Sequence, residues 1–149
     1  MDYREEKDLL GTCRIPQDVY WGIHTYRALS NFKFGSHKTP ATLIRALAQV
    51  KKACCDTNRE LGYLHSDIAV AICNACDEII NGQWQEQFPL DAMQGGAGTS
   101  TNMNINEVIA NRALELLGYP KGDYAHCHPL EHVNLHQSTN DVYPSALKI

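Results

Sequence analysis

The sequence predicts a mainly α-helical domain with at most minor β structure. Apolar residues recur at three- and four-residue steps over three separate stretches, which is typical of amphipathic helices. Capping residues or glycines bound these stretches. The segments 1–40 and 121–140 show no such periodicity. We therefore expect a small helical amino-terminal domain with an irregular amino-terminal arm.

The arm, residues 1–40, is expected to be irregular because Gly11, Pro16 and Gly22 interrupt it. Within it, the β-forming run Val-Tyr-Trp at 19–21 favours a short strand. The arm should otherwise contain little regular secondary structure.

Three helices should follow the arm. The first covers about 39–61, with a Thr-Pro pair as cap and first helical residue and Gly62 as its stop. Its apolar face consists of Leu43, Ala46, Leu47, Val50, Ala53 and Cys54. The second begins at a Ser-Asp cap and covers about 66–82. The third covers 106–117 and ends at a glycine that precedes a proline.

A polar, histidine-rich loop is expected over 121–140, and 143–149 resembles the first turns of another helix. Proline at the second position of that segment suits a first turn. A chain that stops as a helix begins is typical of part of a longer protein.

Composition and charge argue against several classes of function. The chain of 149 residues is 44% hydrophobic and 20% charged, which is a globular balance. Its net charge of -4 provides no basic surface for nucleic acid or an anionic membrane. No apolar run approaches the ~20 residues of a membrane span, and no secretory signal is visible. We expect a cytoplasmic protein without nucleic-acid or membrane partners.

The six cysteines should be reduced thiols in such a protein. Cys73 and Cys76 have the spacing of half a zinc or redox site, but no second CxxC follows. Both lie in the second expected helix, so packing on one helix face is the favoured interpretation. The adjacent Cys54 and Cys55 are interpreted in the same way.

The stretch 94–104 (QGGAGTSTNMN) is rich in glycine, hydroxyl and amide groups and precedes a helix. Glycine lets a ligand approach the backbone, and the positive end of a helix favours a carboxylate or phosphate. The spacing matches neither a P-loop nor a dinucleotide-binding loop. Caps use the same residue types, so composition alone leaves an anion site and a capped turn equally open.

A second donor-rich stretch, 137–141 (QSTND), also stands just before a helix. Its short hydroxyl and amide groups can donate to a small anion without adding full charge. Helix capping is the alternative, and for Asp141 it is the commoner role. Together the two stretches favour a small, polar, anionic ligand.

Four histidines lie in the loop before the second stretch. Two of the pairs have i, i+4 spacing, which on a helix would place metal ligands on one face. Pro129 interrupts the first pair and no carboxylate stands in HExxH register, so surface or hydrogen-bonded histidines are the favoured interpretation. The four are His126, His128, His132 and His136.

These stretches, in this order, resemble the aspartate ammonia-lyases (aspartases) of the aspartase/fumarase superfamily over essentially the whole chain. The amino-terminal match lies in segments 6–12, 15–16, 20–28 and 31–32. The first substrate motif is matched by segments 88–91, 94–100, 102–104 and 106–108. The entry into the second domain is matched by segments 132–134, 137–141 and 143–144.

Two sequence motifs of this chain are closer to those of aspartases than to those of fumarases. Family fumarases usually carry Gly-Ser-Gly-Thr-Gln-Ser and a double serine, whereas this chain has Gly-Gly-Ala-Gly-Thr-Ser and Gln-Ser-Thr-Asn-Asp. Fumarases also carry an accessory anion site that reads His-Pro-Asn-Asp-Asp. Here 128–132 reads His-Pro-Leu-Glu-His, which makes that site doubtful.

The resemblance implies reversible conversion of L-aspartate to fumarate and ammonia without an organic cofactor. A base removes a proton beside the β-carboxylate, which gives an aci-carboxylate dianion that fixed donors stabilise. By resemblance, the β-carboxylate is bound by Thr99, Ser138 and Thr139, and Asn140 holds the substrate near its amino group. Ser100 and Thr101 are further candidates.

The family's remaining machinery does not match any part of this chain. A general-base serine on a Gly-Ser-Ser loop, a Lys and an Asn for the α-carboxylate, and a Thr-His pair are all expected downstream. Family sites are also assembled from three subunits of a homotetramer. The resemblance thus implies a lyase domain over 1–138 and the truncated start of the central long-helix domain over 139–149. It also implies no catalytic residue in this chain, which should be inactive alone.

Two other functions are weighed against this one. The first is a fumarase or related fumarate-producing lyase, which the residues of the two motifs disfavour. The second is a non-catalytic, truncated relative that binds a partner. Binding of an unrelated protein but of no dicarboxylate would favour the second alternative.

Overall fold

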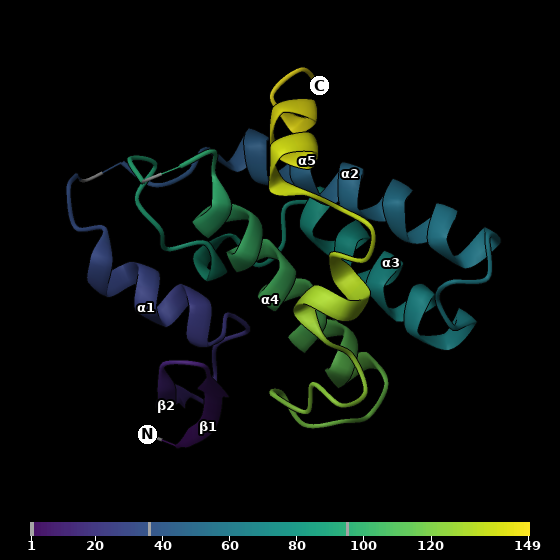
Figure 1. The fold of residues 1–149 in the computed structure, drawn as a ribbon, viewed down its shortest axis with the longest axis horizontal. Coiled ribbons are helices and arrows are strands. Elements are labelled where there is room, and N and C mark those ends of the chain that lie inside the picture. Colours follow the sequence, from purple (N-terminus) through teal and green to yellow (C-terminus); the bar gives the residue numbers. More distant parts are fainter. Residues whose placement is uncertain (1, 36, 95) are drawn as a thin grey trace.

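The computed structural model describes residues 2–35, 37–94 and 96–149. Figure 1 shows a helical molecule with one small hairpin, so the mainly α prediction is confirmed. The elements in chain order are β1 (Tyr3–Asp8), β2 (Gly11–Pro16), α1 (Ile23–Asn31), α2 (Ala41–Glu60), α3 (Ser66–Ile80), the 3-10 turn η1 (Gln85–Gln87), α4 (Thr99–Leu116), the π-helical turn η2 (Pro129–Val133) and α5 (Thr139–Ala146).

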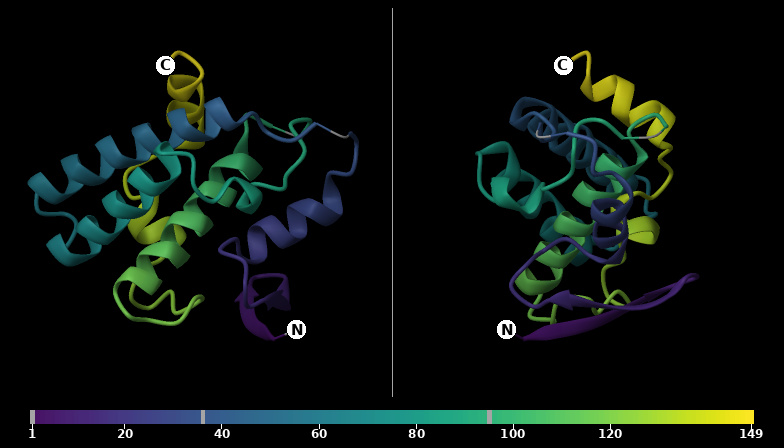
Figure 2. Two further views of the ribbon diagram at one scale, coloured as in Figure 1. Left: turned by 180° about the vertical axis from the view of Figure 1, so that it is seen from behind. Right: turned by 90° about the vertical axis from the view of Figure 1, so that its left-hand side faces the viewer.

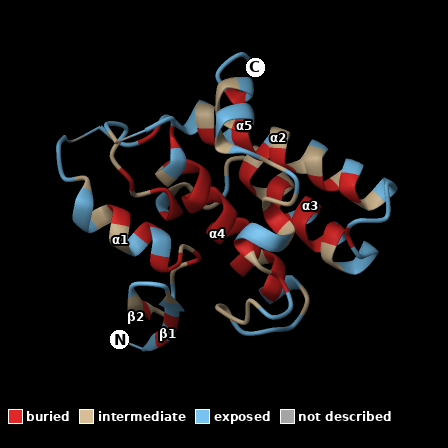
Figure 3. Cartoon of the chain, viewed as in Figure 1, coloured by how far each residue is buried: buried red, intermediate tan, exposed pale blue. Residues whose placement is uncertain are grey.

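Helix α4 runs through the middle of the molecule. The α2–α3 hairpin packs on one side of it and α1 on the other (Figure 1). The β hairpin and α5 lie at opposite ends (Figure 2). Colouring by burial shows that the buried residues concentrate along α4 and the inner faces of α2 and α3 (Figure 3). No helix in the described ranges is long and apolar enough to cross a bilayer.

The apolar face predicted for the first helix packs in this core only in part: Ala46 and Leu47 are buried, but Ala53 is exposed and Cys54 is half-buried, while Ile44 and Cys55 are buried instead. Leu47 of α2 is fully buried, and Ile72 of α3 and Ile109 of α4 lie in the same cluster. Cys73 and Cys76 are also buried there, which confirms their packing role. All six cysteines are free thiols. Apolar contact among three helices therefore holds the centre of the chain together.

The amino-terminal arm is not irregular, which corrects the prediction. β1 and β2 pair antiparallel from Tyr3 opposite Pro16 to Asp8 opposite Gly11, and α1 follows. The inward side chains of β1 are Arg4 and Glu6, both buried. Since this buried face is charged rather than apolar, the sequence lacks the alternation by which a half-buried strand is recognised.

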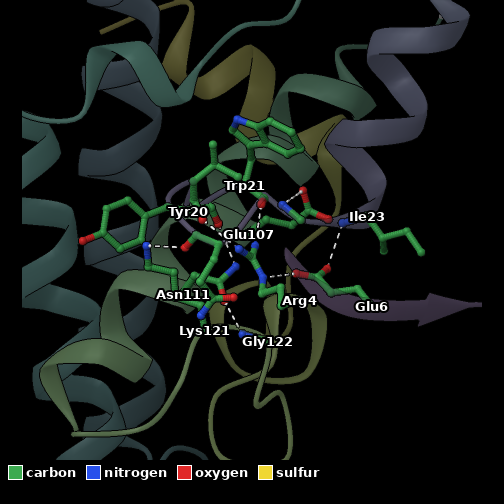
Figure 4. Close-up of polar contacts among 12 residues, drawn as sticks. Arg4, Glu6, Tyr20, Trp21, Ile23, Glu107, Asn111, Lys121 and Gly122 are labelled. Atoms are coloured by element: carbon green, nitrogen blue, oxygen red, sulfur yellow. Dashed lines mark hydrogen bonds and ion pairs between the residues drawn. The ribbon is translucent and has the colours of Figure 1, made fainter. Parts of the chain in front are cut away.

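The predicted strand at 19–21 does not form either. The segment runs as a bend, and its carbonyl groups are bonded by a side chain instead of a neighbouring strand. Arg4 donates to the carbonyls of Val19 at 2.9 Å and Trp21 at 2.7 Å, as the close-up in Figure 4 shows for Trp21. Arg4 Nε also donates to Glu6, whose other oxygen accepts from Ile23 N at 2.8 Å. The buried ion pair thus replaces a sheet partner.

Two helix starts also differ from prediction. α4 begins at Thr99, seven residues before the expected 106. The sequence did not predict this first part of the helix, because 99–106 contains weak helix formers without an apolar stripe. Tertiary burial overrides that weakness: Asn102 and Asn106 in this segment are both buried. α5 begins at Thr139, four residues before the expected 143.

The other helix boundaries agree closely with the sequence. α2 begins at Ala41, so Pro40 occupies the cap position that Thr39 was expected to hold. Helix α3 begins at Ser66, the expected cap, and its N-cap is His65. The loop expected over 121–140 contains the π-helical turn η2. A lone five-residue turn has no apolar period from which it could have been predicted.

Candidate functional site

The two donor-rich stretches of the sequence meet at one cavity of about 380 Å³. One wall is the loop that leads into α4, and the other is α5. The lining residues are Ala92, Gln94, Gly96, Ala97, Gly98, Asn140, Tyr143, Pro144 and Leu147. Gly95 of the first stretch lies outside the described residues. Segments some forty positions apart in the sequence therefore share a single concave site.

Close approach of the two walls depends on glycine. Gly98 has a φ of +83°, and Gly96 has a φ of +74°, both in the left-handed region. A Cβ on Gly98 would collide with the ring of Tyr143 from α5. The loop can therefore touch α5 only with a residue that has no side chain at 98.

Gln94 fixes the shape of the loop from inside. Its Oε1 accepts from Thr101 N at 2.9 Å, and its Nε2 donates to Thr101 Oγ1 at 2.7 Å. Nε2 also donates to the carbonyl of Asp91 at 3.1 Å. One side chain thus ties the loop to the first turn of α4. Gln94 lies within the predicted motif, but no sequence pattern indicates this role.

The start of α4 faces outward beside the loop. Thr99 is exposed, and its Oγ1 lies 3.9 Å from the position that a Cβ on Gly96 would take. The N-cap, Gly98, has no side chain to accept the first helical N–H groups. Gln94 accepts from one of these groups, Thr101 N, and the positive end of the helix dipole favours an anion beside the others.

The start of α5 lies next to that of α4. Thr139 Oγ1 accepts from Asn102 Nδ2 at 2.9 Å, which joins the first turns of the two helices. Ser138 is the N-cap of α5 and its Oγ accepts from Asn140 N at 3.2 Å. Because Ser138 and Asn140 are exposed, their side chains can also reach a ligand.

The six predicted binding residues fall into different settings. Thr99, Ser138 and Asn140 are exposed, and Asn140 lines the cavity. Ser100 and Thr139 are half-buried. Thr101 is 1% exposed and bonded to Gln94, so its hydroxyl serves the protein rather than a ligand in this chain. The other five predicted residues remain candidates for direct contact with a ligand.

Neutral groups dominate the cavity. None of the residues that line it, within the described ranges, carries a charge. The positive ends of α4 and α5 lie beside it, with Asp141 in the first turn of α5. A small carboxylate or dicarboxylate is the ligand class that such a site suits, because hydroxyl, amide and backbone N–H groups all donate to it.

The four loop histidines are each engaged within the protein. His128 Nδ1 accepts from the backbone N of Leu130 at 3.0 Å and His132 Nδ1 accepts from the backbone N of His128 at 2.8 Å. His136 bonds Asn58 at 2.9 Å, and His126 lies 3.1 Å from an aspartate and stacks on a tyrosine. Across 2–35, 37–94 and 96–149, no three His, Cys, Asp or Glu side chains gather as metal ligands would.

A larger cavity of about 710 Å³ lies between the tip of the β hairpin, α1 and η2. Leu9, Leu10 and Leu130 contribute apolar walls, and His128 lies at its edge. His128 Nδ1 already caps η2. The remaining polar lining is charged or titratable (Lys7, Asp8, His24, Glu107 and Tyr124), which distinguishes this cavity from the uncharged smaller one.

Comparison with known proteins identifies the family. A family model described as "Lyase" matches residues 11–149. The chain is 53% identical over 148 residues to an aspartate ammonia-lyase of Bacillus subtilis, covering 99% of this chain and 31% of that protein. It is 50% identical over 148 residues to a class II fumarate hydratase of Thermosynechococcus vestitus, covering 99% and 32%.

A solved structure gives the same result. The crystal structure titled fumarate lyase:delta crystallin from Brucella melitensis superposes with a TM-score of 0.95 at 54% identity. The match covers 97% of this chain and 33% of that one. The chain spans about a third of the length of the relatives that it matches. With both motifs, the fold and the family model in agreement, the chain belongs to the lyases of the aspartase/fumarase superfamily.

Proposed function

We propose that this chain forms the amino-terminal part of a lyase that reversibly converts L-aspartate to fumarate and ammonia. The observation that carries the proposal is the convergence of the loop before α4 and the start of α5 on one uncharged cavity. Identity to aspartate ammonia-lyases over 99% of the chain supports the same reaction.

The chemistry explains why neutral donors belong there. A base removes a proton from the carbon beside the β-carboxylate, and its electron pair moves into that carboxylate. The product is an aci-carboxylate with two negative charges, from which ammonia leaves as the C–N bond breaks. Donors held in place before the reaction stabilise this charge most where it develops.

The exposed groups have distinct proposed roles. Thr99 and Ser138, with Thr139, bind the β-carboxylate, and Asn140 holds the substrate near its amino group. The positive ends of α4 and α5 add to the stabilisation of the dianion. The half-buried Ser100 is a further donor at the edge of this set.

The base and the groups that bind the α-carboxylate are proposed to come from sequence that corresponds to the rest of the relatives' length, which this chain does not cover. In this proposal the active form is a homotetramer, whose neighbouring subunits bring those groups to the cavity. The 149-residue chain alone should bind the β-carboxylate weakly and show no turnover.

A second candidate is hydration of fumarate to malate. The 50% identity to a class II fumarate hydratase favours it almost as strongly as the aspartase match favours deamination. Both reactions pass through the same kind of dianion, so the cavity suits either. They differ in whether the leaving group is ammonia or water.

Two grafts separate the candidates. In the aspartase graft, residues 1–149 replace the matched segment of the Bacillus subtilis aspartate ammonia-lyase. In the fumarase graft they replace the matched segment of the Thermosynechococcus vestitus enzyme. Fumarate formation from aspartate and from malate is followed by ultraviolet absorbance. We expect aspartate turnover by the first graft and loss of malate turnover by the second; the reverse pattern would select the fumarase alternative, and turnover by neither would reject both.

A further inference from the structure

Lys51, in the middle of α2, is an amine at the centre of the protein. It is 0% exposed, and burial lowers its pKa to about 7. Its Nζ donates to Asn134 Oδ1 and to Gln137 Oε1, both at 2.8 Å. Neither partner is a carboxylate, and among the described residues Lys51 forms no ion pair. Burying an amine without an opposite charge is unfavourable, so these two contacts need an explanation.

Asn134 is the centre of a larger network. Its Oδ1 also accepts from Asn102 Nδ2 at 3.2 Å and from Asn106 Nδ2 at 3.1 Å, both in α4. The Oδ1 atoms of Asn102 and Asn106 are themselves buried without a hydrogen-bond partner among the described residues. The side-chain amides of Asn102 and Asn106 are therefore oriented so that their nitrogens donate to Asn134, and this orientation leaves their oxygens without a hydrogen bond.

The network holds the turn that leads into α5. Asn134 Nδ2 donates to the carbonyl of Gln137 at 3.0 Å, and Gln137 Nε2 donates to the carbonyl of Val133 at 3.0 Å. His136 in this turn has a φ of +57°, an unfavourable backbone conformation for a residue with a side chain. Contacts from α2 and α4 are needed to keep such a turn in one shape.

The turn ends at the candidate site. Ser138 directly follows Gln137, and Asn102 continues the network to Thr139 Oγ1. Any shift of 134–137 therefore moves the first residues of α5, including Asn140, which lines the cavity. Misplacement of a binding group by about 1 Å can lower a rate ~10²-fold.

We propose that Lys51 is a positioning residue for the substrate-binding residues Ser138, Thr139 and Asn140. It acts through Asn134 and Gln137, which hold the turn that leads into these three residues, of which Asn140 lines the cavity. The inference rests on the proposed function, because positioning matters only if these residues bind substrate. A methionine would fill the same space at a smaller desolvation cost, so the amine is explained by the contacts that it makes.

The first test uses the aspartase graft with Lys51→Met, and with Lys52→Met as the matched control. Lys52 is the next residue, but it lies at the surface in an ion pair with Asp77. For Lys51→Met we expect kcat for aspartate to fall about 10–100-fold, with a smaller change in KM. Lys52→Met should keep the kcat of the unmodified graft. An unchanged kcat in a folded Lys51→Met graft would overturn the proposal.

A double-mutant cycle tests the route. If Lys51 acts through Gln137, then Lys51→Met and Gln137→Leu together should lower kcat little more than either does alone. Fully additive losses would show that the two side chains act separately, and would overturn the inferred route. A residue that only stabilised the core would lower the unfolding midpoint without this coupling in kcat.

A second measurement needs no activity. In the 149-residue chain, Asp141 N and Val142 N donate to the carbonyl of Ser138 at 3.0 Å. Hydrogen exchange at these two amides should be faster in Lys51→Met than in Lys52→Met, relative to amides in the middle of α3. Equal protection would overturn the proposal whether or not the grafts are active. Faster exchange in a chain whose graft turns over only malate would preserve the positioning role and reject aspartate as substrate.

Discussion

Thr25 Oγ1 donates a 2.6 Å hydrogen bond to Oε2 of Glu107, a carboxylate that is 2% exposed in the middle of α4. The same carboxylate accepts the backbone N–H groups of Gly22 at 2.9 Å, His24 at 2.7 Å and Thr25 at 3.1 Å. The N-cap of α1, Gly22, has no side chain, so Glu107 supplies the missing cap from another helix. One acid thereby docks α1 against α4.

Glu107→Gln should therefore destabilise the chain. The amide of glutamine presents a donor where the wild-type carboxylate has an acceptor, which leaves at least one buried N–H unpaired. We expect the free energy of unfolding to fall by about 1–3 kcal/mol, measured by urea denaturation. Glu60→Gln, at the exposed end of α2, is the control and should change it little. Equal midpoints for the two variants would contradict the capping role.

Lys51 should make stability depend on pH. The unfolded lysine keeps its proton up to a pKa near 10.5, whereas burial lowers the folded pKa to about 7. Between these values the unfolded state binds more protons, so stability should rise with pH by up to about 1.4 kcal/mol per unit.

The check is the difference in unfolding free energy between wild type and Lys51→Met from pH 6 to 10. Taking the difference removes the titration of groups that do not interact with Lys51, whereas Cys54 and Cys76, whose pKa values Lys51 lowers, still contribute to it. Lys52→Met should follow wild type, because Asp77 raises the pKa of Lys52 rather than lowering it. A difference that stays constant across this range would show that Lys51 keeps its ordinary pKa.

Thr99 and Thr101 should respond differently to loss of the hydroxyl. Thr99→Ala in the aspartase graft should lower kcat for aspartate ~10²–10³-fold, because an exposed donor to the developing charge is lost. Thr101→Val should instead lower the unfolding free energy by about 1–3 kcal/mol, because its buried hydroxyl accepts from Gln94. Steady-state kinetics and denaturation of both variants provide the comparison. A reversal of the two effects would move the binding role from Thr99 to Thr101.

Gly98 and Gly96 form a matched pair for testing the contact between the loop and α5. Both have positive φ, so alanine strains the backbone at either position. A Cβ on Gly98 would also collide with Tyr143, whereas one on Gly96 would meet Thr99 Oγ1 only at 3.9 Å. Gly98→Ala should therefore destabilise the chain more than Gly96→Ala does, as measured by thermal unfolding. Adding Tyr143→Ala should recover part of the loss only for Gly98→Ala; equal losses would argue against this contact.

The local sequence pattern determined those helices whose apolar residues repeat along a single segment. The apolar faces of α2 and α3 and the glycine after each predicted those elements almost to the residue. The two donor-rich motifs, read together with the amino-terminal segments, indicated the superfamily, which the comparisons confirm. These features depend on the identity and spacing of residues that are close in sequence.

Tertiary structure alone decided the features that rest on buried polar groups. The β hairpin, the early start of α4 and the cap of α1 depend on Arg4, Glu6, Asn102 and Glu107, which a sequence pattern assigns to the surface. The same holds for Lys51 and its contacts with the turn before α5. A polar residue shows no periodic signal that distinguishes solvent from a partner, because its burial is favourable only when groups distant in sequence arrive to bond it.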